Sequence, residues 1–584
     1  MGHCVVRGSP RNGFCVAIPG TRVDTTRSVD DALKFALYMD TQRLILFFVF
    51  SFSVLMLWEA WQKESRSPVL REAALPNVDS IQLPKVGAGS VGKAAGGVPT
   101  TAPEAARAHR ERVRVITGGL IAEVDTLGGD IVSLEFREHK DSNDKNKNFV
   151  LLTPKYRYSV QSGLIGAGLP NHKTLYSASE KVASLKPGQD RLEVRLEAPS
   201  VNGVKVVKVL TFYRDSYLID ISHEITNTTA DALAAHAYFQ VTRNGESPPG
   251  DTAMMATYTG AAAYTEQDKY VKVSFSDIDK GKTPYTKTAD NGWIGMVQHY
   301  FVTALLPKEK QPREFYTKKL AEGFYSAGVI LPTPAIGPGA TGKVTMPLYA
   351  GPQEQDKLKV IAPGLDLVVD YGWLTVIAAP LFWVLQFFHK LLNNWGLAIV
   401  LLTVVLKLIF FPLSAASYKS MARMKLVTPR LTKLREQYGD DKVKLNQAMM
   451  DLYKTEKINP LGGCLPIVVQ IPVFISLYWV LLAAVELRHA PFYGWIVDLA
   501  SPDPWYVLPA LMMASMIVQT KLNPTPPDPV QAKVMMIMPF AFGVMFFFFP
   551  SGLVLYWFVN NILSILQQWQ ITRMMGDGKA APRR

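Results

Sequence analysis

The stretch TVVLKLIFFP, Thr403–Pro412, ends an apolar run that begins at Leu391. After Leu397 the only polar side chains in this run are those of Thr403 and Lys407. About 20 mostly apolar residues suffice for a helix to cross the ~30 Å hydrocarbon core of a bilayer. The stretch therefore predicts a membrane span that carries one cation. The chain on either side decides what kind of membrane protein this is.

Four other stretches have the same apolar character. They are Leu44–Trp61, Leu461–Leu482, Trp505–Thr520 and Val534–Leu566. Trp and Tyr residues stand at several of their edges, as expected of side chains anchored at the level of the lipid headgroups. The sequence thus predicts a polytopic α-helical membrane protein with five spans, of which four form a core over residues 393–572.

Positive charge is concentrated between the second and third spans. The formal net charge is +13, and Lys and Arg are dense in residues 412–460 and in the tail, residues 573–584. The loop 486–504 has Arg488 as its one firm positive charge. Because basic loops stay on the cytoplasmic side, we predict that both termini and residues 412–460 are cytoplasmic and that residues 62–390 lie outside. The membrane topology thereby accounts for the positive net charge, and no specific nucleic acid partner is predicted.

The N-terminal residues 1–38 differ from everything that follows. They are polar and punctuated by Pro and Gly, and a second methionine, Met39, opens MDTQR just before the first apolar stretch. We predict that residues 1–38 are a disordered or non-native extension, and we prefer translation from Met39. Residues 39–62 end without a small-residue cleavage site, so we predict that they are retained as the first transmembrane anchor.

Residues 63–110 have the composition of a flexible linker, rich in Pro, Ala, Gly and Ser. Within them Gly87–Ala94 nearly spells a phosphate-binding loop. That loop needs Ser or Thr after its lysine, where this chain has Ala94, and it needs a strand before it and a helix after it. We therefore predict no nucleotide site and no cofactor.

Residues 111–350 alternate apolar and polar side chains, as in RLEVRLEA and VKVVKVLTFYRDSYLIDISHEITN. This period of two is typical of half-buried antiparallel strands, and a segment of this length predicts one large β-sandwich outside the membrane. The histidines here show no metal-ligand spacing, so no metal site is predicted. A pair of sugar-cleaving carboxylates could not be seen from sequence separation alone. A membrane-anchored enzyme of envelope carbohydrate therefore stays an alternative.

Residues 351–392 are apolar but broken by Pro and Gly. We predict that the later part, Pro380–Leu392, is an amphipathic helix at the outer interface of the membrane. The alternative is a part of a sixth span. In residues 412–460 we expect two antiparallel helices, because Pro429 can open a helix and Gly439 can close one. This charged hairpin is either a docking surface or a solvated connection.

Each of the four core spans carries a narrow polar stripe. The residues are Thr403 and Lys407, Gln470, Ser515 and Gln519, and Tyr556, Asn560 and Ser564. One such residue alone is commonly a hydrogen bond between helices, worth about 0.6 kcal/mol. Stripes on all four spans instead favour a shared interior that contains water.

Lys407 has two interpretations. It lies five residues before Pro412, so at ~1.5 Å per residue its stem could reach the inner boundary of the membrane. Alternatively it faces the polar interior and meets the negative groups of a substrate. No acid lies inside the other spans to neutralise it. A small-solute secondary transporter usually pairs such a charge with an opposite one. We therefore keep transport only as a runner-up function.

Several motifs resemble a known family. They are NPLGGCLPIVVQIPVFISLYWVL (Asn459–Leu481), ELRHAPF (Glu486–Phe492), FPSGLVLYWFVNNILSILQQ (Phe549–Gln568) and the opening MDTQR…LWEAW. The chain resembles the YidC/Oxa/Alb3 family of membrane protein insertases, in its Gram-negative branch with five spans. The resemblance covers essentially everything from Met39 onward.

This resemblance implies a periplasmic β-supersandwich and a hydrophilic groove open to cytoplasm and lipid. A single cation, often arginine in the family, would sit in the groove, and here the residue is Lys407. The resemblance places Thr403 and Gln470 beside Lys407 in the groove. From the polar stripes we add Ser515, Gln519, Tyr556 and Asn560 as candidate groove residues. A slide for the apolar part of the substrate would consist of Phe474, Trp557, Met512 and Met516.

The function implied is insertion and folding of nascent proteins of the bacterial inner membrane, alone or with the Sec translocon. No catalytic residue is expected, because such a protein is not an enzyme. The implied partners are nascent membrane proteins, Sec components, the lipid bilayer, and the ribosome through the cytoplasmic hairpin and the basic tail.

Overall fold

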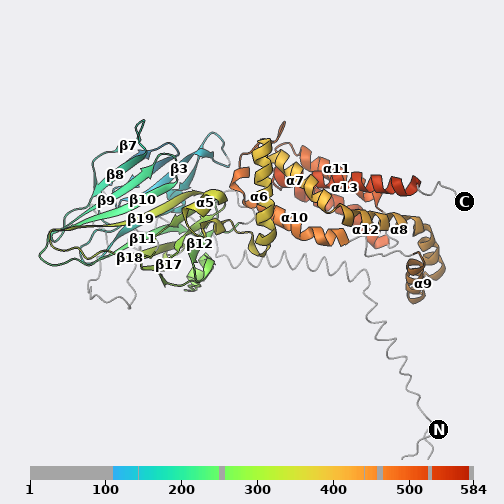
Figure 1. Cartoon of the computed structure of the whole chain (residues 1–584), viewed down its shortest axis with the longest axis horizontal. Coiled ribbons are helices and arrows are strands. Elements are labelled where there is room, and N and C mark those ends of the chain that lie inside the picture. Colours follow the sequence, from blue (N-terminus) through green and yellow to red (C-terminus); the bar gives the residue numbers. More distant parts are fainter. Residues whose placement is uncertain are drawn as a thin grey trace, which may run out of the picture. The chain divides into compact units, whose positions relative to one another are not determined.

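The computed structural model describes residues 110–142, 144–248, 257–308, 310–321, 323–439, 441–456, 465–523 and 529–577 (Figure 1). Several predictions lie outside these residues. They concern the extension 1–38 with its start at Met39, the anchor 39–62, the linker with its Gly87–Ala94 motif, and the last residues of the tail.

The strands form two sheets. The ten-stranded sheet contains, in order, β14 (Thr288–Ala289), β17 (Arg313–Ala321), β18 (Phe324–Pro332), β11 (His236–Asn244), β5 (Ser159–Ile165), β3 (Asp130–Lys140), β2 (Leu120–Asp125), β1 (Arg112–Ile116) and β7 (Val182–Ser184), with β4 (Asn148–Leu152) beside β3. The nine-stranded sheet contains β13 (Lys269–Val273), β12 (Gly260–Thr265), β15 (Trp293–Gln298), β16 (Phe301–Leu305), β19 (Thr341–Pro352), β10 (Leu218–Asn227), β9 (Val204–Tyr213), β8 (Arg191–Glu197) and β6 (Ser177–Ala178). Among the described strands only β1 and β7 pair in parallel.

The hairpin β9–β10 shows how the sequence pattern makes this fold. Leu210 and Phe212 alternate with more exposed neighbours, and they stand opposite Ile221 and Ile219 in the antiparallel register. Because successive strand residues point to opposite faces, all four apolar side chains turn to one side of the sheet.

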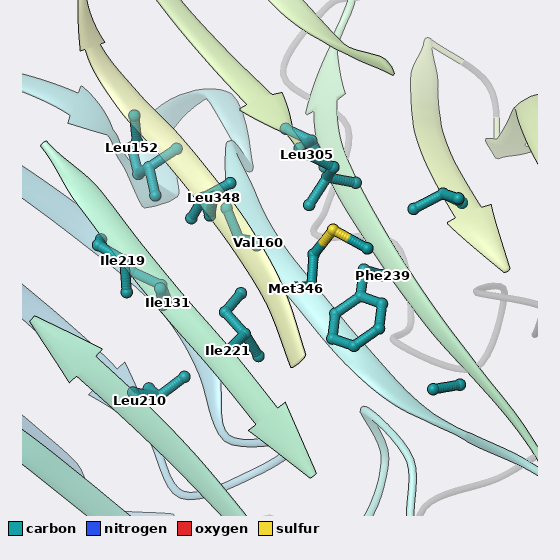
Figure 2. Close-up of a cluster of buried hydrophobic side chains, with 14 of the residues drawn as sticks. Ile131, Leu152, Val160, Leu210, Ile219, Ile221, Phe239, Leu305, Met346 and Leu348 are labelled. Carbon is teal, nitrogen blue, oxygen red and sulfur yellow. The ribbon is translucent and has the colours of Figure 1, made fainter. Parts of the chain in front are cut away.

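The inner faces of the two sheets share one apolar core. Figure 2 shows Ile131, Val160 and Phe239 of the ten-stranded sheet gathered with Ile221 and other side chains of the nine-stranded sheet. All are at most 2% exposed. Each buried side chain of this size contributes about 1.5–3 kcal/mol relative to exposure. The prediction of a large antiparallel β-sandwich is confirmed.

One charged side chain interrupts this core. Lys208 of β9 is completely buried, and its Nζ donates to the carbonyl oxygens of Gly128 (2.6 Å) and Ser162 (3.1 Å). Asp130, buried nearby, accepts from Gln161 Nε2 at 2.9 Å. Burial raises the pKa of Asp130 and lowers that of Lys208, and the charge of each opposes the shift of the other.

The buried histidines predict acid sensitivity of the sandwich. Burial lowers the pKa of His172 to about 3 and those of His139 and His299 to about 4. These groups stay neutral in the fold but take up protons in the unfolded chain at about pH 6.5. The stability that they contribute is therefore present above pH 6.5 and falls as the pH drops towards 4.

We expect about 1.4 kcal/mol of stability to be lost per pH unit and per such histidine within that range. Amide hydrogen exchange of β5 and β11, followed from pH 7 to pH 4 on the full chain in lipid nanodiscs, measures this loss. His172→Gln removes one of these titrating groups, so the loss of stability per pH unit is expected to be smaller by about 1.4 kcal/mol. Exchange protection independent of pH in the parent chain would contradict the prediction.

The helices follow mainly after the strands. They are α4 (Phe275–Asp279), α5 (Gln355–Ile361), α6 (Thr375–Leu392), α7 (Trp395–Ile409), α8 (Phe411–Tyr438), α9 (Lys442–Thr455), α10 (Leu465–Ala483), α11 (Val507–Leu522), α12 (Pro529–Phe546) and α13 (Ser551–Asp577), and the 3-10 helices are η2 (Pro154–Tyr156), η3 (Leu365–Val368), η4 (Gly372–Leu374) and η6 (Val485–Leu487).

Within the described residues one helix, α6, is by itself long and apolar enough to cross a bilayer. The pair α7 and α8, bent by 66°, would be a second if it is taken as one span. Pro412 at the start of α8 lacks the N–H that would continue α7 straight. Shorter apolar helices lie at Val469–Ala483, Val507–Leu522 and Ala532–Phe546. The count of five spans is therefore not confirmed.

The stretch Val534–Leu566, predicted as a single span, consists of two helices in the structure. α12 ends at Phe546 and α13 begins at Ser551. Pro550 has no N–H to donate, and the next two backbone N–H groups form hydrogen bonds outside the helix. The N–H of Ser551 donates to the carbonyl of Ser501 (2.8 Å) and that of Gly552 to the carbonyl of Leu499 (2.9 Å).

Two helix starts also differ from the prediction. α6 begins at Thr375, five residues before Pro380, and α8 runs through Pro429 instead of beginning there. Val427 and Leu431, on either side of Pro429, are buried against Met449 and other residues of α9. This packing holds α8 together although one hydrogen bond is lost at the proline. The two antiparallel helices of the hairpin are nevertheless present (Figure 1).

Candidate functional site

Lys407 points into the helical core. Asn394 caps α7 by accepting from the N–H of Leu397 at 3.0 Å. Lys407 follows in the last turn of α7 and is 6% exposed. Its Nζ donates to Ser564 Oγ on α13 at 2.7 Å. The ammonium group therefore bonds to a neighbouring helix and does not extend towards the end of its own. Of the two interpretations of Lys407, the structure agrees with the inward one.

Thr403 lies on the same buried face of α7, one turn before Lys407, and is 1% exposed. Its hydroxyl donates to the carbonyl of Ile399 at 2.7 Å. The i, i+4 spacing thus correctly predicts a common face. The Thr403 hydroxyl, however, is bonded to the backbone of its own helix.

Gln470 of α10 joins two of the predicted residues of α13. Its Nε2 donates to Asn560 Oδ1 at 3.0 Å, and its side chain is also hydrogen-bonded to the Tyr556 hydroxyl. Asn560 in turn accepts from Ser564 through its carbonyl oxygen at 2.8 Å. Hydrogen bonds therefore run from Lys407 through Ser564 and Asn560 to Gln470 and Tyr556. We call these five residues the Lys407 network.

Ser515 belongs to a different contact of α13. Its Oγ accepts from Asn561 Nδ2 at 2.7 Å and donates to the carbonyl of Met512 at 2.7 Å. Consecutive helix residues are about 100° apart, so Asn560 faces α10 while Asn561 faces α11. Gln519, half-buried one turn after Ser515, is not a member of the Lys407 network.

Sequence reasoning missed three residues of these contacts. Asn561 contacts α11, and Gln568 Nε2 donates to Asn523 Oδ1 at 3.0 Å. The sequence predicts Ser564 on a polar stripe but does not assign it to the groove. The Asn560–Asn561 doublet was the available signal, because two adjacent amides on one helix must serve two neighbouring helices.

The four residues of the predicted slide are not all accessible to a substrate. Phe474 packs edge-on against Trp557 at 4.4 Å between ring centroids and stacks on Tyr556 at 6.2 Å. Met516 is half-buried and packs against the apolar core of the helices. Met512, by contrast, is 1% exposed, because it is packed inside the helical core. It presents no surface to a substrate in this structure.

The charge of Lys407 is not neutralised locally. Among the described residues no carboxylate pairs with it, and the group that accepts its hydrogen bond is the neutral hydroxyl of Ser564. The described residues also contain no group of three or more His, Cys, Asp or Glu that could hold a metal ion. The site is a lone cation among neutral donors and acceptors.

The loop after α10 carries the ELRHAPF motif and is bonded to the end of β3. Arg488 donates to Ser142 Oγ at 3.1 Å, and His489 Nε2 contacts the carbonyl oxygen of Lys140 at 3.2 Å. His489 Nδ1 lies 3.1 Å from Asp498 Oδ2 of the same loop. This motif therefore holds the loop in place, and its residues are not part of the Lys407 network.

Two family models match the chain. The YidC periplasmic domain matches residues 112–384, and the 60Kd inner membrane protein family matches residues 387–578. The membrane protein insertase YidC of Dechloromonas aromatica is 57% identical over 546 residues, which cover 93% of this chain and 99% of that relative. The chain belongs to the YidC family of membrane protein insertases. The resemblance predicted from the sequence is confirmed.

A second curated relative agrees with this assignment. The membrane protein insertase YidC of Aromatoleum aromaticum is 55% identical over 545 residues, covering 93% of this chain and 99% of the relative. A crystal structure of an active YidC insertase with its first transmembrane domain resolved covers 78% of this chain and 92% of its own, at 18% identity and a TM-score of 0.37. As a YidC family member the chain is an inner membrane protein that acts on membrane proteins, and not an enzyme.

Proposed function

We propose that this YidC family member receives the hydrophilic segment of a nascent membrane protein at the Lys407 network. The apolar segment of the same substrate then leaves along Phe474 and Trp557 into the lipid. The residues Thr403, Ser515 and Gln519 would line the path of the hydrophilic segment. The observation that carries the proposal is the buried, unneutralised charge of Lys407.

A lone cation in a poorly solvated interior attracts acidic and polar groups. Two opposite unit charges 4 Å apart attract by about 1 kcal/mol in water but by about 4 kcal/mol at an effective dielectric constant of 20. A carboxylate of the substrate that reaches Lys407 would exchange a neutral hydroxyl acceptor for a charged one, and charge-assisted hydrogen bonds are the stronger kind. The site therefore favours a substrate tail that is polar or acidic.

The neutral members of the network lower the cost of carrying that tail. An unsatisfied polar group costs several kcal/mol in hydrocarbon. The amides of Gln470 and Asn560 each offer both donors and acceptors, and they now satisfy one another. A substrate backbone can take over these bonds one at a time, so that fewer of its groups are unpaired during transfer.

For the topology we propose six crossings, by the anchor 39–62 and by α7, α10, α11, α12 and α13. Five crossings would leave the N-terminus and the tail on opposite sides, whereas six place both in the cytoplasm with the hairpin 412–460. Residues 62–390 would then be periplasmic, and α6 would lie at the outer interface. The domain boundaries 63–110, 111–350, 351–392 and 393–572 belong to the same proposal.

The Sec translocon and the ribosome are the further partners that we propose. The basic hairpin and tail would face the ribosome, since both are rich in Lys and Arg. Ribosomal RNA would then be contacted through its phosphates without recognition of base sequence.

Reconstitution tests the function. Purified chain in liposomes, supplied with a translation system making a small single- or double-span protein, is expected to make that protein protease-protected. Liposomes without the chain, and liposomes with the Lys407→Glu variant, are the controls. Equal insertion in all three would contradict the insertase mechanism. Solute flux across the same liposomes without insertion would favour a transporter.

A further inference from the structure

Ser564 brings together side chains of three helices. On α13, its Oγ donates to the carbonyl oxygen of Asn560 at 2.8 Å. The same oxygen accepts from Lys407 Nζ of α7 at 2.7 Å, and the hydroxyl of Tyr418 on α8 interacts with the Ser564 side chain. Ser564 is 5% exposed, so these contacts are its environment.

The bonds to Asn560 and Lys407 fix the orientation of the Ser564 hydroxyl. A serine hydroxyl has one hydrogen to donate and two lone pairs that accept. Because the hydrogen goes to the backbone of α13, the lone pairs point away from that helix, and one of them accepts from Lys407. The direction of the ammonium group is thus fixed by the backbone of α13.

We propose that Ser564 is a positioning residue that holds the Lys407 ammonium group in the core and links it, through Tyr418, to the root of the cytoplasmic hairpin. This inference rests on the proposed function of Lys407. Ser564 acts through Lys407 and needs no contact with the substrate.

The identity of the acceptor matters for this role. A carboxylate in the place of Ser564 would neutralise Lys407 and compete with an acidic substrate, whereas a hydroxyl positions the ammonium group without cancelling its charge. Without the hydroxyl, the lysine stem is free to turn towards the inner edge of the membrane, where Pro412 lies five residues away at ~1.5 Å per residue.

The test uses the full chain in liposomes and two versions of one small substrate, with a neutral or a doubly acidic translocated tail. Ser564→Ala is expected to lower insertion of the acidic version about 3- to 10-fold and that of the neutral version less than about 2-fold. Ser564→Thr, which keeps the hydroxyl, is expected to restore insertion. Tyr418→Phe, which removes only the hydroxyl that interacts with Ser564, is expected to give a smaller loss with the same preference.

A second readout follows Lys407 itself. Acylation of Lys407 by a water-soluble amine reagent, quantified on its peptide, is expected to be faster in Ser564→Ala than in the parent chain and in Ser564→Thr. A merely structural role of Ser564 would not produce this difference in a variant with unchanged thermal unfolding. If Ser564→Ala does not fold, the Tyr418→Phe and Ser564→Thr measurements decide in the same way.

The background of Lys407→Met separates the two proposals. There, Ser564→Ala is expected to have no further effect. Equal losses for both tails, or a loss that persists in the Lys407→Met background, would overturn the positioning role alone. If Lys407→Met itself does not distinguish the acidic from the neutral tail, the proposed function of Lys407 fails, and the role of Ser564 fails with it.

Discussion

Replacing Lys407 by glutamate is expected to reduce insertion of a substrate with an acidic tail by at least about 100-fold. The variant replaces an attraction of about 4 kcal/mol with a repulsion of similar size, and each 1.4 kcal/mol is a factor of ten. No carboxylate among the described residues pairs with Lys407 in the parent chain, so its full charge is available to the substrate. The glutamate would also face the hydroxyl of Ser564, which can donate to it.

The liposome assay measures this effect with two matched variants. Lys407→Arg keeps the charge and is expected to insert the acidic substrate within about 3-fold of the parent or better, because the guanidinium keeps the positive charge and can also bind a carboxylate in a bidentate way. Lys407→Met keeps the length without the charge and is expected to fall between the two. Normal insertion of the acidic substrate by Lys407→Glu would show that charge attraction is not the mechanism.

Replacing Lys208 by methionine is expected to destabilise the β-sandwich by about 3–5 kcal/mol. Lys208 is completely buried, and its ammonium group satisfies the carbonyl oxygens of Gly128 and Ser162. Methionine fills similar space but donates no hydrogen bond, so these oxygens lose their partner. Asp130 would also lose the nearby positive charge that favours its ionised form.

The control lies in the same strand. Lys205 of β9 is exposed, and Lys205→Met is expected to change stability by less than about 0.5 kcal/mol. Denaturant unfolding of the full chain in nanodiscs, followed by amide exchange of β9 and β10, measures both variants. Equal effects of the two substitutions would contradict the account of the buried lysine. Adding Asp130→Asn to Lys208→Met is expected to recover part of the loss.

The strands could be predicted because the alternation of side chains is local. In β9 the period of two correctly assigns Val206, Leu210 and Phe212 to the inner face. The same period places Lys208 inward as well, a signal that the strand prediction contained but did not use. Its partners could not be predicted, because Gly128 and Ser162 come from distant parts of the chain.

The helix boundaries were less predictable. Pro429 has the form of a helix start, yet the packing of Val427 and Leu431 against α9 carries the helix through it. Pro550 separates α12 from α13, because the following N–H groups bond to the 499–501 loop. In both places a tertiary contact determines whether the helix continues through the proline or ends there. Such a contact cannot be predicted from the local sequence.

The sequence predicts which residues of the site share a helix face. It does not predict which of them form hydrogen bonds with one another. The i, i+4 spacing correctly places Thr403 and Lys407 on one buried face. It could not show that Ser564 accepts from Lys407, or that Ser515 bonds to Asn561 away from the Lys407 network. Such pairing depends on the rotation of each helix about its axis, which apolar spans barely encode in sequence.

Site-specific crosslinking from Gln470 tests the central claim most directly. Gln470 faces Asn560 in the Lys407 network, while its neighbour Ile471 is exposed on α10. A photoreactive residue at each position is compared, using a ribosome-stalled nascent chain whose hydrophilic tail has just left the ribosome. We predict that the tail crosslinks to position 470 and that position 471 contacts lipid or the apolar segment. Equal crosslinking of the tail to both positions, or to position 471 alone, would contradict the account.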